Sequence, residues 1–271
     1  MNARRRLDLE LVSKGLAETR AEAGYLVAQG RVLVGGAVAE KPSRQVGQSE
    51  PVLVTGPPPR FASRGGEKLE AALAKFQMDV RGKGVLDAGA STGGFTDCVL
   101  QRGAAQVVAV DVGYGQILPG LRSRDRVEVL ERANVRYLAP GDLGGRRFDL
   151  VLADLSFISL VTVAGALIGL AKPVAELVLL VKPQFEVGKA AVSKGKGVVR
   201  APELWAEAVC EVAGAFHARG ARVAGTMVSP LYGAKGNVEF FLYLRTGWPP
   251  GPSAHGDVVD ALVAAGRRGG R

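Results

Sequence analysis

The 271-residue chain contains few of the residue types on which metal sites and disulfide frameworks depend. It has two cysteines and two histidines, and Cys98 and Cys210 lie far apart in helical patterns, without metal-ligand spacing. This scarcity excludes a disulfide framework and argues against a histidine-based metal site or catalytic triad. It fits a reducing, cytoplasmic setting. We therefore expect no metal cofactor.

Long apolar runs are also missing. The richest stretch, residues 157–170, is interrupted by Ser159, Thr162 and Gly165, so we predict a buried helix there rather than a membrane span. The basic N-terminus, residues 1–6, is not followed by the apolar core of a signal peptide. These features predict that the protein has no membrane partner.

The net charge of +9 favours a polyanionic partner, although many soluble proteins are basic. The length allows about two domains. Pro57-Pro58-Pro59 makes a stiff break between them. We predict a first unit at 1–55, a linker at 56–62, a main domain at 63–247 and a loose tail, rich in Gly, Pro and Arg, at 248–271.

The first unit has the pattern helix, helix, small sheet. Apolar residues at helical spacing predict one helix that begins near Asp8 and ends at Gly15, and a second helix that ends at Gly30. Thr19 is a natural N-cap for the second helix, because Glu22 three residues later completes a capping box. Short strands are predicted to follow at 31–34, 37–38 and 52–54, the first two joined by a glycine turn.

The stretch from Gly84 to Phe95, GVLDAGASTGGF, organises the main domain. A short apolar strand, a turn of small residues and a helix form the first unit of a nucleotide-binding α/β sheet. Asp87, at the end of the strand and inside the loop, would repel a pyrophosphate but could hold a cationic amino acid. The pattern also departs from G-x-G-x-x-G. Both features favour S-adenosylmethionine (SAM) over a dinucleotide, and a purely structural turn is the alternative.

Apolar strands alternate with helices through the rest of the main domain. Ser63 is predicted to cap a helix before the first strand. Further strands are predicted at 106–111, 127–130, 148–154, 176–183, 223–228 and 238–244, with helices at 158–171 and 202–220. This alternation predicts an α/β fold whose mostly parallel, seven-stranded sheet is covered on both faces.

Polar side chains stand where these apolar strands end. Asp111, Asp154 and Lys182 end three of them, and Asn134 follows another. Ligands bind outside the carboxyl ends of strands in an open α/β sheet, so we expect these side chains and Asp87 to meet in one cleft. Asp111 could accept both hydroxyls of a ribose, and Asn134 could reach an adenine edge. Each could instead only shape a turn, as Asp and Asn often do.

Residues 5–54 resemble the S4-type RNA-binding domain. The resemblance is carried by Arg6-Leu7-Asp8, Gly15-Leu16, Thr19-Arg20, Leu26-Val27, Gly30, Gly36 and Lys41-Pro42. It departs at Thr19 and Gly35, where the family usually has Ser and Asn. It implies that basic side chains contact structured RNA. The candidate RNA-binding residues, two of them in the main domain, are Arg4, Arg5, Arg6, Lys14, Arg20, Arg31, Arg44, Arg64 and Lys189. A solvated charged surface is the alternative, because Glu10, Glu18 and Glu22 lie among them.

The main domain resembles the ribose 2′-O-methyltransferases of the FtsJ type. The TlyA-type family, often labelled haemolysin A, is the closer resemblance and covers residues 5–246. It is carried by Ser63-Arg64-Gly65-Gly66, 86–96, 111–116, 154–159, 181–189, Ser229-Pro230 and 236–239. It implies a Rossmann-like class I methyltransferase that uses SAM to methylate a ribose 2′-hydroxyl of ribosomal RNA, commonly in a cytidine. Ribosomal RNA and ribosomal subunits are then the expected partners.

The same resemblance implies a role for each candidate site residue. Lys182 would orient the hydroxyl and accept its proton if neutral, and Lys68 would position the nucleotide. Asp154 and Glu239 would hold the two lysines in place. The expected cofactor-binding residues are Asp87, Gly89, Ala90, Ser91, Gly93, Gly94, Phe95, Asp111, Asn134 and Asp154. This chemistry needs no metal.

Three other functions are open to the sequence. The family label allows an RNA-binding protein with haemolysin activity and no methyl transfer, against which the lack of a predicted span or signal argues. An RNA-binding module with an inactive methyltransferase fold is disfavoured, because all four candidate catalytic residues are present. A methyltransferase for small molecules would not need the N-terminal unit.

Overall fold

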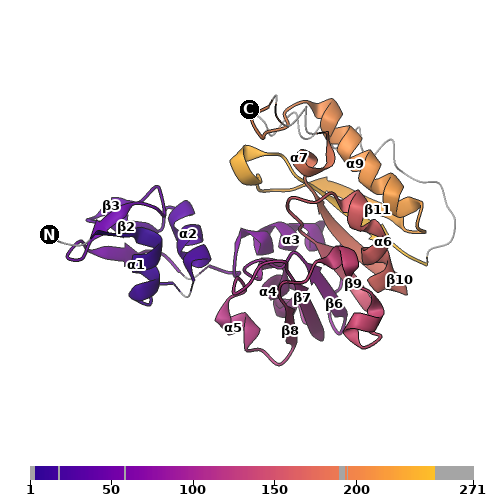
Figure 1. The fold of residues 1–271 in the computed structure, drawn as a ribbon, viewed down its shortest axis with the longest axis horizontal. Helices are drawn as coiled ribbons and strands as arrows, with labels where there is room; N and C mark the ends of the chain where they lie inside the picture. Colours follow the sequence, from indigo (N-terminus) through magenta and orange to yellow (C-terminus); the bar gives the residue numbers. More distant parts are fainter. Residues whose placement is uncertain (1–3, 18, 58, 189–192, 194, 248–271) are drawn as a thin grey trace.

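The computed structural model describes residues 4–17, 19–57, 59–188, 193 and 195–247. The predicted tail at 248–271, Pro58 of the predicted linker, and Lys189 therefore lie outside the described residues. Figure 1 shows a small N-terminal unit beside a larger α/β unit, with helix α2 of the first facing the second.

The N-terminal unit has the predicted pattern of two helices and a small sheet. Its predicted elements are α1 (Leu7–Ser13), α2 (Arg20–Ala28), β2 (Val32–Val34), β3 (Ala37–Val38) and β5 (Val52–Val54). Strand β2 pairs antiparallel with both β3 and β5. Thr19 caps α2 as predicted, since its hydroxyl accepts a hydrogen bond from the Glu22 N–H at 3.1 Å.

The sequence did not reveal a second small sheet in this unit. Strand β1 (Arg4–Arg6) pairs antiparallel with β4 (Gln45–Gly47). A strand of three arginines has no alternation of apolar and polar residues, so periodicity could not identify it. Its pairing with β4 holds the chain just before α1.

A buried carboxylate, Asp8, joins β1 to both helices. Arg6 donates to the two oxygens of Asp8 at 3.0 and 2.8 Å, and Arg20 donates to Oδ2 at 3.0 Å. Asp8 also accepts from the Leu9 N–H at 3.0 Å in the first turn of α1. The hydrogen bonds from Arg6, with a smaller contribution from Arg20, lower the pKa of Asp8 to about 2. Two candidate RNA-binding arginines therefore also hold the unit together.

The main domain is built on a seven-stranded sheet with the order β11-β12-β10-β9-β6-β7-β8. Only β12 runs antiparallel to its neighbours. The strands are β6 (Gly84–Ala88), β7 (Gln106–Val110), β8 (Val127–Leu130), β9 (Phe148–Ala153), β10 (Ala171–Val181), β11 (Arg222–Val228) and β12 (Phe240–Arg245). All seven predicted strands are present, and β10 begins five residues earlier than predicted, with an irregular register between Ala171 and Glu176.

Helices cover both faces of this sheet (Figure 1). They are α3 (Arg64–Lys75), α4 (Gly94–Gln101), α5 (Pro119–Arg122), α6 (Leu160–Leu170), α7 (Pro183–Glu186) and α9 (Pro202–His217), with 3₁₀ helices η1 (Val135–Tyr137), η2 (Pro140–Leu143) and η3 (Ala234–Gly236). Leu86 packs in the core under α6 and α9, whereas its neighbour Val85 packs in the core under α3 and α4. Alternate strand residues thus fill two cores, which explains the continuous apolar strands.

The strand order places a crevice at the carboxyl ends of β6 and β9. Successive strands run outward from β6 in one direction to β8, and then resume on its other side with β9. Such a reversal is where open α/β sheets bind ligands. None of the helices in the described part of the chain is long and apolar enough to cross a membrane.

Loss of the Asp8 carboxylate should destabilise the N-terminal unit. Because Arg6 and Arg20 lower the folded-state pKa of Asp8, the stabilisation is complete above about pH 4 and is lost as the pH falls toward about 2. Asp8→Asn should remove it at neutral pH, at a cost of about 1 to 3 kcal/mol. Hydrogen exchange should then show faster exchange in α1 and α2 but not in α4.

Asp79→Asn is the matched control, because Asp79 pairs with Arg81 at a site where both side chains are exposed. An exposed pair contributes little to stability, so exchange in that variant should match the wild type. Unchanged protection of α1 in Asp8→Asn would contradict the role assigned to Asp8.

Candidate active site

Two adjoining cavities open at the carboxyl ends of β6, β7 and β9. The strand-end cavity, about 660 Å³, is lined by Val110, Asp111, Asn134, Val135, Ser156 and Ile158, among others. The interdomain cavity, about 360 Å³, is lined by Tyr25 and Ala28 of α2, by Arg64 and Lys68 of α3, and by Phe95. Gly89, Ser91 and Asp154 line both cavities, so the two are parts of one continuous site.

The glycine turn after β6 allows two loops to touch. Gly89 has a φ of +86°, and a Cβ atom there would lie 2.5 Å from the Asp154 carbonyl oxygen. Gly93 has a φ of +96°, and a Cβ atom there would lie 2.4 Å from Leu121 of α5. Gly89 thus lines both cavities, whereas Gly93 allows close packing against α5. Of the other predicted loop residues, Ala90, Gly94 and Phe95 line the interdomain cavity.

Asp87 lies within β6, so its expected place inside the loop is wrong. Its side chain is fully buried and lines neither cavity. Asp87 Oδ2 accepts a hydrogen bond from the Thr96 hydroxyl of α4 at 2.6 Å. Burial raises the pKa of Asp87 to about 7, and the nearby charge of Asp154 acts in the same direction. Asp87 therefore supports the loop from beneath, and its contact with a cofactor stays a prediction.

Asp111 and Asn134 both line the strand-end cavity, and both also shape its walls. The Asp111 carboxylate accepts from the Ser91 N–H at 2.8 Å and from the Gly113 N–H at 2.7 Å. Asn134 Oδ1 accepts from the Arg136 N–H at 3.0 Å and caps η1. The turn-forming alternative thus holds for both residues, but each carboxylate oxygen of Asp111 retains a lone pair for a ligand.

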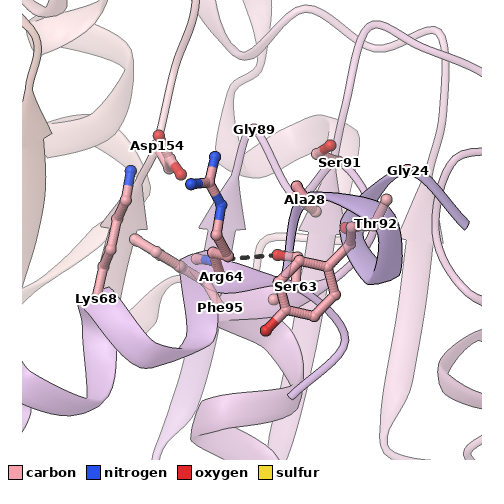
Figure 2. A pocket seen from close by; sticks show the side chains of 14 residues that line it. Gly24, Ala28, Ser63, Arg64, Lys68, Gly89, Ser91, Thr92, Phe95 and Asp154 are labelled. Atoms are coloured by element: carbon pink, nitrogen blue, oxygen red, sulfur yellow. Dashed lines mark hydrogen bonds between the residues drawn. The ribbon is translucent and has the colours of Figure 1, made fainter. Parts of the chain in front are cut away.

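The four candidate catalytic residues form two ion pairs. Lys68 Nζ lies 2.6 Å from Glu239 Oε2, and Lys182 Nζ lies 2.7 Å from Asp154 Oδ1. Both lysines and Glu239 are less than one-tenth exposed. Lys182 Nζ also donates to the Ser156 hydroxyl at 3.1 Å. Figure 2 shows the Lys68 ammonium and the Arg64 guanidinium pointing toward Asp154.

Sheet register explains how such distant residues meet. Val181 pairs with Phe240 across the antiparallel β10 and β12, so Lys182 and Glu239 are the next residues beyond that pair. Ala153 of β9 pairs with Leu179 of β10, which places Asp154 at the adjacent strand end. Lys68 comes from α3, whose first turn is capped by Ser63 through the Gly65 N–H at 3.2 Å.

The N-terminal unit contacts the main domain beside this site. The Tyr25 hydroxyl of α2 donates to Glu67 Oε1 at 2.8 Å, and Glu67 immediately precedes Lys68. Burial, together with this hydrogen bond to Glu67, raises the pKa of Tyr25 to about 12. This contact could not be predicted from the sequence, since a tyrosine and a glutamate on two separate helices form no motif.

Most candidate RNA-binding residues of the N-terminal unit have partners within it. Glu10 pairs with Arg5 at 3.7 Å and with Lys14 at 3.3 Å. Arg44 pairs with Glu50 at 3.1 Å, and Arg31 donates to the Thr55 carbonyl at 2.8 Å. The charged-surface alternative therefore describes part of this unit. The Arg5 and Arg20 side chains nevertheless remain more than half exposed, and they retain donors for phosphates. Arg4 and Arg64 are exposed as well.

Two known protein families match this chain, one over each of its two units. The FtsJ-like methyltransferase family matches residues 61–246, and the S4 domain family matches residues 5–52. A solved structure of a candidate SAM-dependent methyltransferase from Listeria monocytogenes has a TM-score of 0.51 at 13% identity, covers 67% of this chain and 99% of its own, and shares the fold alone. Fold, site and family matches together define an α/β, class I methyltransferase of the FtsJ-like type with an N-terminal S4 domain.

Relatives that match nearly the whole chain narrow this class. The 16S/23S rRNA (cytidine-2′-O)-methyltransferase TlyA of Mycobacterium tuberculosis is 49% identical over 98% of this chain and 100% of its own length. Hemolysin A of Brachyspira hyodysenteriae is 34% identical over 88% of this chain and 98% of its own length. The structure of a candidate hemolysin from Streptococcus thermophilus has a TM-score of 0.78 at 36% identity, and the match covers 99% of this chain and 97% of that protein. The chain belongs to the TlyA family, which confirms the predicted resemblance.

The buried Asp87 carboxylate should make stability depend on pH. Its folded-state pKa is about 7, against an ordinary value of 3.8, so the folded protein loses stability as the pH rises between these values. The free energy of unfolding of Asp87→Asn minus that of the wild type should therefore be larger at pH 8 than at pH 4, and this increase is the gain. Because a tenfold change in proton affinity is worth about 1.4 kcal/mol, the gain should exceed about 2 kcal/mol.

Urea denaturation of the cofactor-free protein at both pH values measures this gain. Thr96→Val provides the matched comparison, since it removes the hydroxyl that donates to the charged carboxylate and should destabilise the protein more at pH 8 than at pH 4. An equal difference between Asp87→Asn and the wild type at the two pH values would show that the carboxyl does not titrate in this range.

Proposed function

We propose that this protein transfers the methyl group of SAM to a ribose 2′-hydroxyl, that of a cytidine, in ribosomal RNA. The observation that carries the proposal is the two ion pairs, Lys68–Glu239 and Lys182–Asp154, each of which has one member, Lys68 or Asp154, in the lining of the two joined cavities. The activity named for the Mycobacterium tuberculosis relative supports the same reaction. We further propose that residues 1–55 bind RNA and that residues 63–247 carry out the transfer.

The residues that line the cavities fit SAM. Asp111 would take the ribose hydroxyls of the adenosine, because each of its oxygens accepts only one backbone hydrogen bond. Asn134 and the apolar Val135 and Ile158 would surround the adenine. Residues 89–92, Gly94, Phe95 and Asp154 would line the methionine end. When bound, SAM supplies an electrophilic methyl group attached to a sulfonium, which needs no metal to activate it.

Lys182 is proposed to act on the hydroxyl that is methylated. Lys182 Nζ donates to the Ser156 hydroxyl at 3.1 Å and lies 2.7 Å from Asp154 Oδ1. The same nitrogen can also hydrogen-bond the 2′-hydroxyl and hold its oxygen in line with the methyl group. The hydroxyl must lose its proton as its oxygen bonds to the methyl carbon and the bond from that carbon to the sulfonium sulfur breaks. A Lys182 that enters this step as the neutral amine would accept that proton and become the ammonium. Asp154 fixes where the Lys182 nitrogen lies.

RNA would be held by both units of the chain. The N-terminal S4 domain exposes Arg4, Arg5 and Arg20, and Arg64 extends this basic surface to the interdomain cavity. We propose ribosomal subunits or their RNA as the partner, and the cytoplasm, where this RNA is found, as the location. A haemolysin function is supported only by names given to relatives, and no feature of the described residues favours it.

Removing the Lys182 ammonium should abolish methyl transfer without abolishing binding. A group that acts mainly in the transition state lowers turnover while ground-state binding persists. Lys182→Ala should lower the single-turnover rate at saturating SAM and ribosomal RNA by about 10² to 10⁴. Lys182→Arg should not restore it, because arginine stays charged and its planar fork differs in shape. Asp154→Ala should be similarly slow.

Lys83→Ala is the matched control, because Lys83 also forms an ion pair, with Glu176, next to the amino-terminal end of β6. It should leave the transfer rate near that of the wild type. A near-normal single-turnover rate in Lys182→Ala would show that Lys182 is only a structural or RNA-contacting lysine.

A further inference from the structure

Two exposed lysines beside the site adopt strained backbone conformations. Lys196 has a φ of +52° and Lys235 a φ of +57°, and each is followed by a glycine with positive φ. The left-handed region costs a residue with a Cβ atom about 1 to 2 kcal/mol, a cost that glycine avoids. The chain therefore places a lysine and a glycine in the same left-handed sequence of conformations twice, at 196–197 and at 235–236.

A buried asparagine ties these two turns together. Asn237 is 2% exposed. Its Oδ1 accepts from the Val199 N–H at 3.0 Å, and its Nδ2 donates to the Gly197 carbonyl at 3.0 Å. A Cβ atom on Gly197 would lie 3.2 Å from Lys235 Nζ, so the Lys235 ammonium rests against the other turn. Two segments about forty residues apart thus form one surface feature.

This feature adjoins the catalytic residues. Glu239, the partner of Lys68, lies two residues beyond Asn237. The Glu239 carboxylate packs against Gly233, where a Cβ atom would lie 1.9 Å from Oε1. The Gly233 N–H donates to the Asn237 carbonyl at 2.8 Å. The same loop therefore sets the position of Glu239 and of the paired lysine turns.

The Lys196 and Lys235 ammonium groups differ from most of the basic groups discussed above. Arg5, Arg6 and Arg20 each pair with a carboxylate, and so do both catalytic lysines. Within the described part of the chain, neither Lys196 nor Lys235 forms an ion pair, and both are exposed. An exposed ammonium without a carboxylate partner attracts an anion. A phosphate group of RNA supplies that negative charge.

We propose that the turns at Lys196-Gly197 and Lys235-Gly236 form a clamp for a backbone phosphate of the RNA strand next to the methylated ribose. This inference rests on the proposed function, and it adds a second RNA contact, on the side of the catalytic residues where β12 begins. The strain at each lysine is retained because the charge is needed there. A purely structural turn would be more stable with glycine at the same positions.

Glycine substitutions separate these two roles. Lys196→Gly and Lys235→Gly remove one charge each and also remove the backbone strain, so their Tm should equal or exceed that of the wild type. Affinity for deproteinised ribosomal RNA should fall about fivefold per lysine at moderate salt. The dependence of log affinity on log salt concentration should flatten by about 0.7 to 0.9 per lysine. Lys235→Arg should keep the wild-type affinity and slope.

Two control variants make the test specific. Gln77→Gly relieves the same strain, since Gln77 has a φ of +52°, without removing a charge. Lys75→Ala removes an exposed charge at the far end of α3. Both should keep the wild-type RNA affinity and salt slope. The clamp is refuted if the Lys196→Gly, Lys235→Gly double variant binds RNA like the wild type, or if Lys75→Ala loses as much affinity as either lysine variant.

Methyl transfer measured on the same samples keeps the clamp separate from the proposed function. A wild-type protein that binds ribosomal RNA but transfers no methyl group to it would refute the proposed function. The clamp is judged only by the RNA affinities and salt slopes.

Discussion

The site depends on two buried lysines, each of which is paired with a carboxylate near the ends of the strands. Breaking a buried ion pair by removing one partner costs about 3 to 5 kcal/mol, so the sheet must hold each partner in place. The register of β10 and β12 positions Lys182 and Glu239, because these two residues lie immediately beyond the paired residues Val181 and Phe240. A slip of one residue between β10 and β12 would turn these side chains to opposite faces. The geometry of the reaction is therefore a property of sheet pairing.

Helix α3 connects that geometry to RNA binding. Its neighbouring residues Glu67 and Lys68 contact the N-terminal Tyr25 and the catalytic Glu239 respectively. RNA held by the N-terminal unit would thus lie at a set distance from Lys182 and the 2′-hydroxyl. The lysine turns joined by Asn237 would approach the same strand from the side of Glu239. Contacts on these two sides, as proposed, would hold the RNA on both sides of the methylated ribose, which suits an enzyme that must select one hydroxyl among many.

Hydrophobic periodicity predicted the seven strands, and cap residues predicted the helix starts at Thr19 and Ser63. The polar residues at strand ends predicted that Asp111, Asn134 and Asp154 line one cavity, whereas Lys182 lines neither cavity and instead pairs with Asp154. These features are local, or follow from parallel strands ending at one edge. The family resemblance, rather than any local pattern, singled out Lys68, because a lysine on a helix is usually solvated. The prediction that Asp87 lies inside the loop was wrong, because its burial depends on packing against Thr96 of α4. The strand β1 and the Tyr25–Glu67 contact were not predictable, because each depends on a partner distant in sequence.

Methylation of a ribose 2′-oxygen in ribosomal RNA can be measured directly. The most direct test incubates the protein with ribosomal RNA and SAM carrying an isotopically labelled methyl group, digests the RNA to nucleosides, and separates them by mass spectrometry. The label should appear in 2′-O-methylcytidine, and alkaline hydrolysis of the RNA should leave the bond after that nucleotide intact. Label on a base, or no label in the RNA at all, would contradict the proposed function.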